Sequence, residues 1–337
     1  MKRYNNLYEK IYNYDNLLLA HKNARKGKLH YREVKTVDKD SEKFLLEIQR
    51  VLKENSYKTS EYKIEEKVER NKKRVIYKLP YYPDRIVHHA IMNIMNEKWV
   101  KTLIKDTYQS IKGRGIHLAA NKIKKILKED RENTKYCLKL DIKKFYPSVD
   151  NKILKRIIRK KIKDQNLLNL LDEIIDSSKG IPIGNYLSQI FGNLYLGEFD
   201  HWIKEVKRIK YYFRYCDDCV ILLNSKEELH KLKIEIDDFL LNRLKLEIKE
   251  NWQIFPIDVR GIDYLGYRFF HNYTLLRKNI VKDFKRKINK IEKNWESMNS
   301  FEIINSVVSY YGWFKIANSY SLKKKFSIDK ILFLKSL

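Results

Sequence analysis

Two adjacent aspartates lie between two apolar runs of this chain, and this arrangement constrains the fold more than any other feature of the sequence. Asp217 and Asp218 separate residues 209–214 from residues 219–223, and both runs are rich in β-branched and aromatic residues. Such runs are typical of strands, so the pattern predicts a hairpin with the acids at its turn. Aspartate also favours turns for backbone reasons. Carboxylates between buried strands are costly unless a cation binds them, and Mg²⁺ prefers such oxygens.

A second acidic strand end lies upstream. Residues 136–142 have the composition of a short strand that ends near Asp141, and Phe145, Tyr146 and Pro147 follow it. Proline ends the strand because it cannot donate to the sheet ladder. If the two acidic ends converge, their carboxylates can hold two metal ions about 3.5–4 Å apart, as phosphoryl transfer requires.

Four segments resemble the motifs of reverse transcriptases, and they occur in the expected order. The segment that begins at Asp141 resembles motif A, and residues 180–189 resemble motif B. Residues 215–218, Tyr-Cys-Asp-Asp, resemble the YxDD sequence of motif C, and residues 260–267 resemble the primer-grip motif E. The resemblance covers about residues 74–320.

The resemblance implies an α+β fold of the right-hand polymerase type, with fingers, a split βαβ palm and a helical thumb. It implies fingers and N-terminal helices over residues 1–135. The palm would cover residues 136–270, with residues 150–180 inserted toward the fingers. A helical, basic thumb would cover residues 271–337.

The resemblance also implies a two-metal nucleotidyl transfer site. Asp141 and Asp217 would be ligands of two Mg²⁺ ions, for which Mn²⁺ can substitute, and Asp218 would be the supporting acid. The backbone carbonyl of Ile142 would face the ion on the nucleotide side.

The same resemblance implies that further residues bind the sugar and the primer. Tyr146 falls where reverse transcriptases place an aromatic ring beneath the sugar, which would exclude a 2′-hydroxyl and select deoxynucleotides. The alternative is that Tyr146 is an ordinary core residue. The primer grip would consist of Tyr264, Leu265, Gly266 and Tyr267.

Several basic residues are candidates for the triphosphate. Arg74 lies where basic residues of the fingers are expected, and Lys112 and Arg114 flank a glycine in a loop that can bind phosphate through charge and backbone N–H groups. A solvated turn is the alternative for this loop. Ile111 stands where relatives usually carry arginine, so Lys112 or Arg114 would replace that contact. Lys249 resembles the motif D lysine that protonates pyrophosphate.

Motif B departs from the commonest reverse transcriptase pattern. Ile183 replaces a glutamine and Gln189 replaces a proline, a form similar to that of diversity-generating retroelement enzymes. In that family, the apolar residue beside the incoming base is associated with errors opposite template adenine. A branched apolar side chain gives no directed hydrogen bond with which to check the base pair. Gly184 would let the backbone approach the nucleotide closely.

The charge of the chain indicates a polyanionic partner. Among its 337 residues, 71 Lys and Arg oppose 43 Asp and Glu, for a formal net charge of +28. Such an excess predicts nucleic acid rather than a membrane, because no apolar run approaches the roughly 18 residues that a span needs. Part of the lysine content can also reflect an AT-rich genome. The three cysteines and the absence of an apolar leader predict a cytoplasmic protein.

The expected function is RNA-directed DNA polymerisation, with template RNA, cDNA, RNA–DNA hybrid and dNTPs as partners. Three biological settings stay open: a diversity-generating retroelement with a small helical accessory protein, antiphage defence with a structured non-coding RNA, and a retron or intron origin. A non-catalytic RNA-binding protein on a polymerase scaffold is a fourth alternative. It is disfavoured because such a protein has no reason to keep three costly acids.

Periodicity predicts where the helices and strands lie. A helix after Pro83 would be capped by Asp84 and would carry packed histidines at His88 and His89. This helix is expected at residues 85–103. Further helices are expected at residues 1–55, 116–130, 150–176, 185–206 and 226–242 and from residue 279, with strands within residues 58–80, 136–142, 211–222 and 252–270.

Overall fold

The structure is a computed structural model that describes residues 3–69 and 72–326. The chain divides into two compact units, each built from separate stretches of sequence. Unit 1 contains the described residues of 1–110, with 142–208 and 236–249. Unit 2 contains 111–141, 209–235 and the described residues of 250–337. Among the described residues, no helix has the length and apolar character that crossing a membrane would require.

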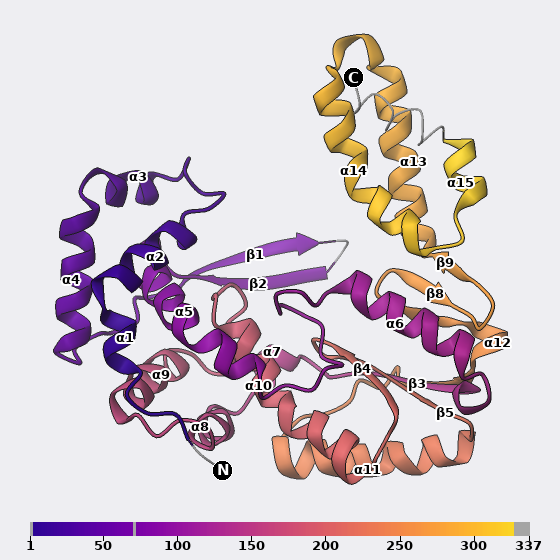
Figure 1. Cartoon of the computed structure of the whole chain (residues 1–337), viewed down its shortest axis with the longest axis horizontal. Coiled ribbons are helices and arrows are strands. Elements are labelled where there is room, and N and C mark those ends of the chain that lie inside the picture. The colour runs from indigo at the N-terminus through magenta and orange to yellow at the C-terminus, as the bar shows by residue number, and fades with distance from the viewer. Residues whose placement is uncertain (1–2, 70–71, 327–337) are drawn as a thin grey trace. The chain divides into compact units, whose positions relative to one another are not determined.

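Unit 1 begins with a group of short helices followed by a hairpin, as expected. The helices are α1 (Tyr8–Tyr12), α2 (Tyr14–Ala24), α3 (Arg32–Lys39) and α4 (Ser41–Lys53), and strands β1 (Lys63–Glu69) and β2 (Lys72–Lys78) pair antiparallel (Figure 1). The turn η1 (Tyr81–Arg85) leads into α5 (Ile86–Val100). His88 and His89 are buried in α5, which confirms their packed character.

The expected N-cap of α5 was wrong. Asp84 lies inside the preceding turn, and the residue at the N-cap position is Arg85, which makes no side-chain cap. The Asp84 carboxylate instead accepts hydrogen bonds from the Tyr57 hydroxyl at 2.6 Å and from the Ser60 N–H at 3.1 Å. Hydrogen bonds to residues distant in the sequence therefore hold the Asp84 side chain away from the N-terminus of α5.

The second stretch of unit 1 is helical. It contains α7 (Phe145–Ser148), α8 (Asn151–Arg159), α9 (Gln165–Asp176), α10 (Ser188–His201) and η3 (Trp202–Val206). Helix α10 begins three residues later than expected.

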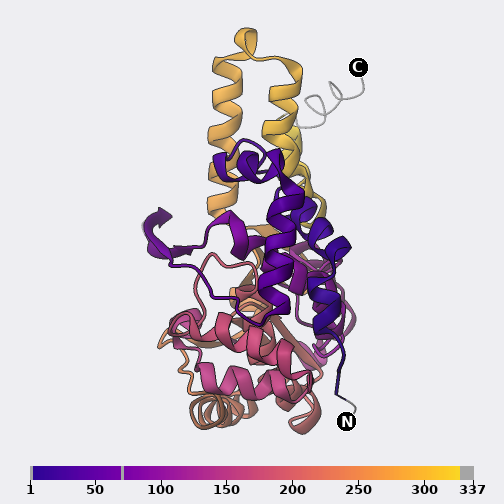
Figure 2. The same cartoon turned by 90° about the vertical axis from the view of Figure 1, so that its left-hand side faces the viewer.

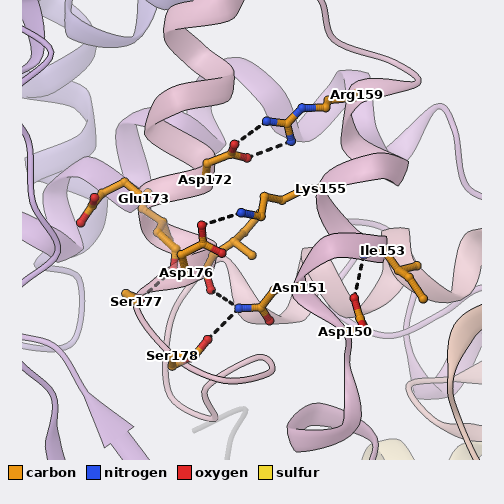
Figure 3. Close-up of polar contacts among 12 residues, drawn as sticks. Asp150, Asn151, Ile153, Lys155, Arg159, Asp172, Glu173, Asp176, Ser177 and Ser178 are labelled. Carbon is orange, nitrogen blue, oxygen red and sulfur yellow. Dashed lines mark hydrogen bonds and ion pairs between the residues drawn. The ribbon is translucent and has the colours of Figure 1, made fainter.

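Helices α8 and α9 are joined by a set of polar contacts (Figure 3). Lys155 pairs with Asp176, and Arg159 pairs with Asp172 through both guanidinium nitrogens. The Asn151 amide donates to the carbonyls of Ile175 at 2.9 Å and Ser178 at 2.8 Å. Both acids and both bases are four residues apart on their helices, so the pairs form only in one register.

The sheet of unit 2 has four strands in the order β4-β5-β3-β6, all paired antiparallel. They are β3 (Tyr136–Asp141), β4 (Tyr211–Tyr215), β5 (Asp218–Leu223) and β6 (Gln253–Pro256) (Figure 1). The expected hairpin around the two aspartates and the expected strand before Asp141 are both confirmed. Helix α6 (Ile116–Glu129) precedes this sheet, with η2 (Glu132–Thr134) between them, and α11 (Lys226–Leu244) runs from unit 2 into unit 1.

A smaller sheet and a helical pair complete the described part of unit 2. After α12 (Ile257–Arg260), strands β7 (Ile262–Tyr264), β8 (Tyr267–Phe269) and β9 (Thr274–Leu276) form a meander. Figure 2 shows α13 (Lys278–Lys293) and α14 (Ser300–Ile316) side by side, and η4 (Trp295–Ser297) connects them. The ring of Phe284 lies 4.9 Å from that of Phe314 in their shared core. Helix α15 (Tyr320–Lys325) is the last described element.

Candidate catalytic site

Arg214 stabilises the acidic turn of unit 2, which is the loop between β4 and β5. Tyr215 pairs with Asp218 across the β4–β5 hairpin, which leaves Cys216 and Asp217 as a two-residue loop. Cys216 has a positive φ of 60°, a conformation that costs a non-glycine residue about 1–2 kcal/mol. The fully buried Arg214 donates to the Cys216 carbonyl at 2.9 Å, which stabilises this conformation.

The sheet register brings the three predicted aspartates together. Asp141 at the end of β3 is the antiparallel partner of Asp218 at the start of β5. The carboxyl of Asp217 lies within hydrogen-bonding reach of the Asp141 carboxyl. The two strand ends therefore converge as the sequence predicted.

The electrostatics of these acids reflect their burial and their mutual repulsion. Burial raises the pKa of the Asp217 carboxyl, and the charge of Asp141 raises it further. Burial also raises the pKa of Asp218 to about 7; the ammonium of Lys139 opposes this shift, and the charges of Asp141 and Asp217 add to it. One oxygen of Asp218, Oδ1, is buried without a hydrogen-bond partner.

These observations fit a divalent cation. Two carboxyls that face each other under burial are stabilised by a cation between them, because its charge reverses the cost of ionising both. Across the described ranges, no group of three or more His, Cys, Asp or Glu side chains is arranged so that it could hold a metal ion. Mg²⁺ is commonly held by one or two carboxylates and completes its shell with phosphate and water, so the Asp141–Asp217 pair suits it.

Motif B lies in unit 1 and is tied to the β1–β2 hairpin. The Tyr77 N–H of β2 donates to the Ile183 carbonyl at 2.8 Å. The Asn185 amide donates to the Tyr62 hydroxyl at 2.8 Å, and the Tyr62 ring contacts the Tyr77 ring edge-on at 5.7 Å. Gly184, at φ 124°, lies so close to the hairpin that an added Cβ would be 2.4 Å from the Tyr77 carbonyl oxygen.

The other unit 1 candidates differ in exposure. Ile183 and Tyr146 are partly exposed, so neither is a core residue, and Gln189 is exposed on α10. The Tyr146 carbonyl accepts from the Ile181 N–H at 2.9 Å, which connects motif A to motif B within this unit. Ile142 is fully buried.

The candidate phosphate-binding residues are divided between the units. Arg74 is exposed on β2 in unit 1, and Lys249 follows an isolated bridge between Ile248 and Ile142 in the same unit. Lys112 is exposed and Arg114 is partly exposed in the loop before α6, which belongs to unit 2. The adjoining Ile111 is only 4% exposed.

The predicted primer grip is the β7–β8 hairpin of unit 2. Leu265 and Gly266 form its two-residue loop with φ values of 52° and 85°. Tyr264 and Tyr267 are both fully buried. A Cβ on Gly266 would lie 2.4 Å from the ring of Trp313 on α14, so glycine lets the turn pack against that helix.

The sequence prediction missed three residues around the acids. Lys139 lies two residues before Asp141 on β3, and its Nζ is 3.8 Å from Oδ2 of Asp218. Asp263 and Arg277 form an ion pair next to it. Strand alternation does place Lys139 on the same face as Asp141. The contact between Lys139 and Asp218 of the β4–β5 hairpin, however, could not be predicted from the sequence.

Comparison with known proteins identifies the class. The family described as reverse transcriptase (RNA-dependent DNA polymerase) matches residues 58–269, more than half of the chain. The chain belongs to this family of RNA-directed DNA polymerases.

Two curated relatives are distant. Protein YkfC of Escherichia coli K12 is 22% identical over 234 residues, with 56% of this chain and 61% of that protein covered. The group II intron-encoded protein LtrA of Lactococcus lactis is 22% identical over 287 residues, with 63% and 47% covered. The chain therefore spans about three fifths of the length of the first and about half of the second.

Solved structures define the fold. The telomerase of Candida tropicalis in complex with a TWJ fragment of telomeric RNA is similar with a TM-score of 0.52 at 13% identity, over 80% of this chain and 55% of that one. The corresponding Candida albicans telomerase has a TM-score of 0.50 at 13% identity, over 85% and 62%. The fold is that of a right-hand polymerase, as expected.

Proposed function

We propose that this protein is an RNA-directed DNA polymerase that makes cDNA from an RNA template by two-metal nucleotidyl transfer. The observation that carries this proposal is the facing pair of Asp141 and Asp217 at the converging ends of the sheet. The partners would be template RNA, dNTPs, cDNA and the RNA–DNA hybrid. Family membership and the excess of positive charge support them.

The acids would hold two Mg²⁺ ions, or Mn²⁺ in their place. Asp141 and Asp217 would be the ligands, Asp218 the supporting acid, and Ile142 would contribute its backbone carbonyl. Bound metal would activate the primer hydroxyl and neutralise charge on the phosphates. The protein would otherwise catalyse by positioning, because phosphoryl transfer needs little covalent help.

The decisive test is Asp217→Asn in a primer-extension assay on an RNA template. The variant keeps the size of the side chain but loses a charged ligand, so we expect a loss of several orders of magnitude in rate with unchanged folding. Asp238→Asn is the matched control, because Asp238 is an exposed acid on α11. Activity of Asp217→Asn within about tenfold of the parent would refute the two-metal assignment.

We propose roles for the remaining residues on the same basis. Tyr146 would exclude the 2′-hydroxyl, and its partial exposure supports this role over core packing. The nucleotide would contact Gly184 and Gln189, and its phosphates would contact basic residues drawn from Arg74, Lys112, Arg114 and Lys249. The primer end would contact the turn at Leu265 and Gly266, with Tyr264 and Tyr267 buried beneath it. We retain fingers over residues 1–135, palm over 136–270, with the 150–180 insertion, and thumb over 271–337, of which 327–337 lie outside the described residues.

A second proposal concerns fidelity. Ile183 is a partly exposed aliphatic residue, and its carbonyl is hydrogen-bonded to the β1–β2 hairpin. Because its side chain cannot check the base pair by a hydrogen bond, we infer error-prone copying, as in diversity-generating retroelements. Ile183→Gln and Ile183→Asn should reduce misincorporation, chiefly opposite adenine, at some cost in rate. The measurement is sequencing of cDNA from one defined template, alongside thermal unfolding.

The outcome also separates the biological settings. If the parent already copies adenines accurately, the retroelement proposal loses its support, and antiphage defence with a structured non-coding RNA becomes the better proposal. A retroelement enzyme would also bind a small helical accessory protein. Sequencing of nucleic acid that co-purifies with the protein would identify the template.

A further inference from the structure

We propose that Lys139 is a positioning residue that holds the acidic turn and the primer-grip hairpin in one fixed arrangement, so that the primer end meets the acid pair. The inference rests on the function proposed above. It concerns unit 2 alone, which contains the acids, the hairpin and Lys139.

The sheet explains how Lys139 reaches the acids. Lys139 pairs with Val220 across the β3–β5 ladder, and Asp141 pairs with Asp218. Residues two apart on a strand share a face, so Lys139 and Asp218 are diagonal neighbours on the face that carries the acids. Diagonal neighbours are within reach of a long side chain, and Nζ of Lys139 lies 3.8 Å from Oδ2 of Asp218.

The same ammonium group also contacts the primer-grip hairpin. Nζ of Lys139 donates to the backbone carbonyl of Asp263 on β7 at 2.6 Å. Asp263 is held in turn by Arg277, which pairs with its carboxylate and donates to the same carbonyl at 3.3 Å. The backbone N–H of Arg277 donates to the carbonyl of Gly266 at 2.9 Å, which links Arg277 to the loop of the hairpin.

A second contact links the primer-grip hairpin directly to the acidic turn. The hydroxyl of the buried Tyr264 donates to the backbone carbonyl of Asp218 at 3.3 Å. The hairpin therefore contacts the acidic turn twice, once directly and once through Lys139. Two contacts at different points restrict sliding and rotation of the hairpin more than a single hydrogen bond would.

Lysine suits this position for two reasons. An ammonium group has three donors on a flexible stem, so one group can pair with a carboxylate and donate to a carbonyl at once. Its charge also offsets the repulsion among three clustered acids. An apolar side chain would leave the Asp263 carbonyl without this donor and Asp218 without this cation.

The test compares Lys139→Met and Lys139→Arg with Lys125→Met in primer extension. Lys125 on α6 forms an exposed ion pair with Glu129, also at 3.8 Å, so its substitution makes the same chemical change in the same unit without touching the hairpin. We expect Lys139→Met to raise KM for the primer–template by about tenfold or more, the size expected for losing a charge-assisted hydrogen bond. KM for dNTP should change by less than about twofold, and Lys139→Arg should recover most of the loss.

The outcomes distinguish this inference from the proposed function. If the parent and Lys125→Met do not extend primers, the polymerase proposal itself fails. If both extend primers and Lys139→Met retains the parental KM for primer–template, the positioning role is wrong. Equal losses for Met and Arg, or a loss that falls equally on dNTP, would also overturn it. Should Lys139→Met fail to fold, as judged by thermal unfolding, Lys139→Leu, which also lacks a donor, and Lys139→Arg make the same comparison.

Discussion

Gly184 in motif B offers the sharpest test of the contact between this loop and the β1–β2 hairpin. Gly184→Ala would place a Cβ 2.4 Å from the carbonyl oxygen of Tyr77 while keeping a backbone φ of 124°. The obstacle is backbone rather than a flexible side chain. The hydrogen bond from the Tyr77 N–H to the Ile183 carbonyl holds the two segments together, so neither can withdraw without breaking it.

The magnitude follows from two costs. An alanine in this region of φ costs about 1–3 kcal/mol, and forced overlap in a packed site costs about 1–3 kcal/mol more. We therefore expect the free energy of unfolding to fall by about 2–6 kcal/mol. Gly27→Ala is the matched control, because Gly27 has φ 70° but nothing within 4 Å of an added Cβ. Its backbone strain costs about 1–2 kcal/mol. Both substitutions also remove about 0.4–1 kcal/mol of freedom from the unfolded chain, and this offset cancels when the two variants are compared.

The assay is thermal unfolding of the parent and both variants, with KM for dNTP measured in parallel. A difference of about 1–4 kcal/mol between the variants corresponds to roughly 2–16 °C in a domain of about 150–250 residues. If Gly184→Ala unfolds within a degree or two of Gly27→Ala, the close approach to Tyr77 does not constrain the loop. If it folds normally but its KM for dNTP is unchanged, the loop does not face the nucleotide.

Three further predictions follow from the described contacts. Tyr146→Val should raise ribonucleotide use with little loss for deoxynucleotides, measured as the ratio of kcat/KM values, and unchanged discrimination would place the sugar gate elsewhere. Binding of an RNA–DNA hybrid should weaken steeply between about 50 and 200 mM salt, because phosphate contacts release counterions, and a flat titration would contradict a basic groove. Gly266→Ala should disturb the primer-grip turn, because its Cβ would lie 2.4 Å from the Trp313 ring, so extension should fall while Gly27→Ala, where nothing lies within 4 Å of an added Cβ, has a smaller effect.

The sequence predicted those parts of the site that depend on local pattern. Asp141, Asp217 and Asp218 follow or begin apolar strands, and a hairpin and its partner strand have few ways to pair, so convergence could be inferred. The role of Asp84 could not, because its donors, Tyr57 and Ser60, lie 27 and 24 residues away.

The start of α10 and the contact of Lys139 with Asp263 also depend on residues that are distant in the sequence. Helix α10 starts at Ser188 rather than Asn185, because the Asn185 amide donates to Tyr62 and the Ser188 hydroxyl donates to the Pro182 carbonyl at 2.6 Å. Lys139 could be assigned to a strand face but not to Asp263, which is 124 residues further along the chain. Such contacts follow from tertiary structure, and neither periodicity nor propensity encodes them.

The left-handed conformation of Leu265 bears on how this enzyme can be engineered. A leucine with φ 52° costs stability that glycine or asparagine would not, yet the turn that carries it joins two buried tyrosines. Anyone seeking a thermostable form of the protein would replace Leu265 first, because the gain there requires no new contact. A sacrifice of stability at one strained turn is typical of a functional site. A stabilised variant that loses processivity would reveal what the leucine contributes.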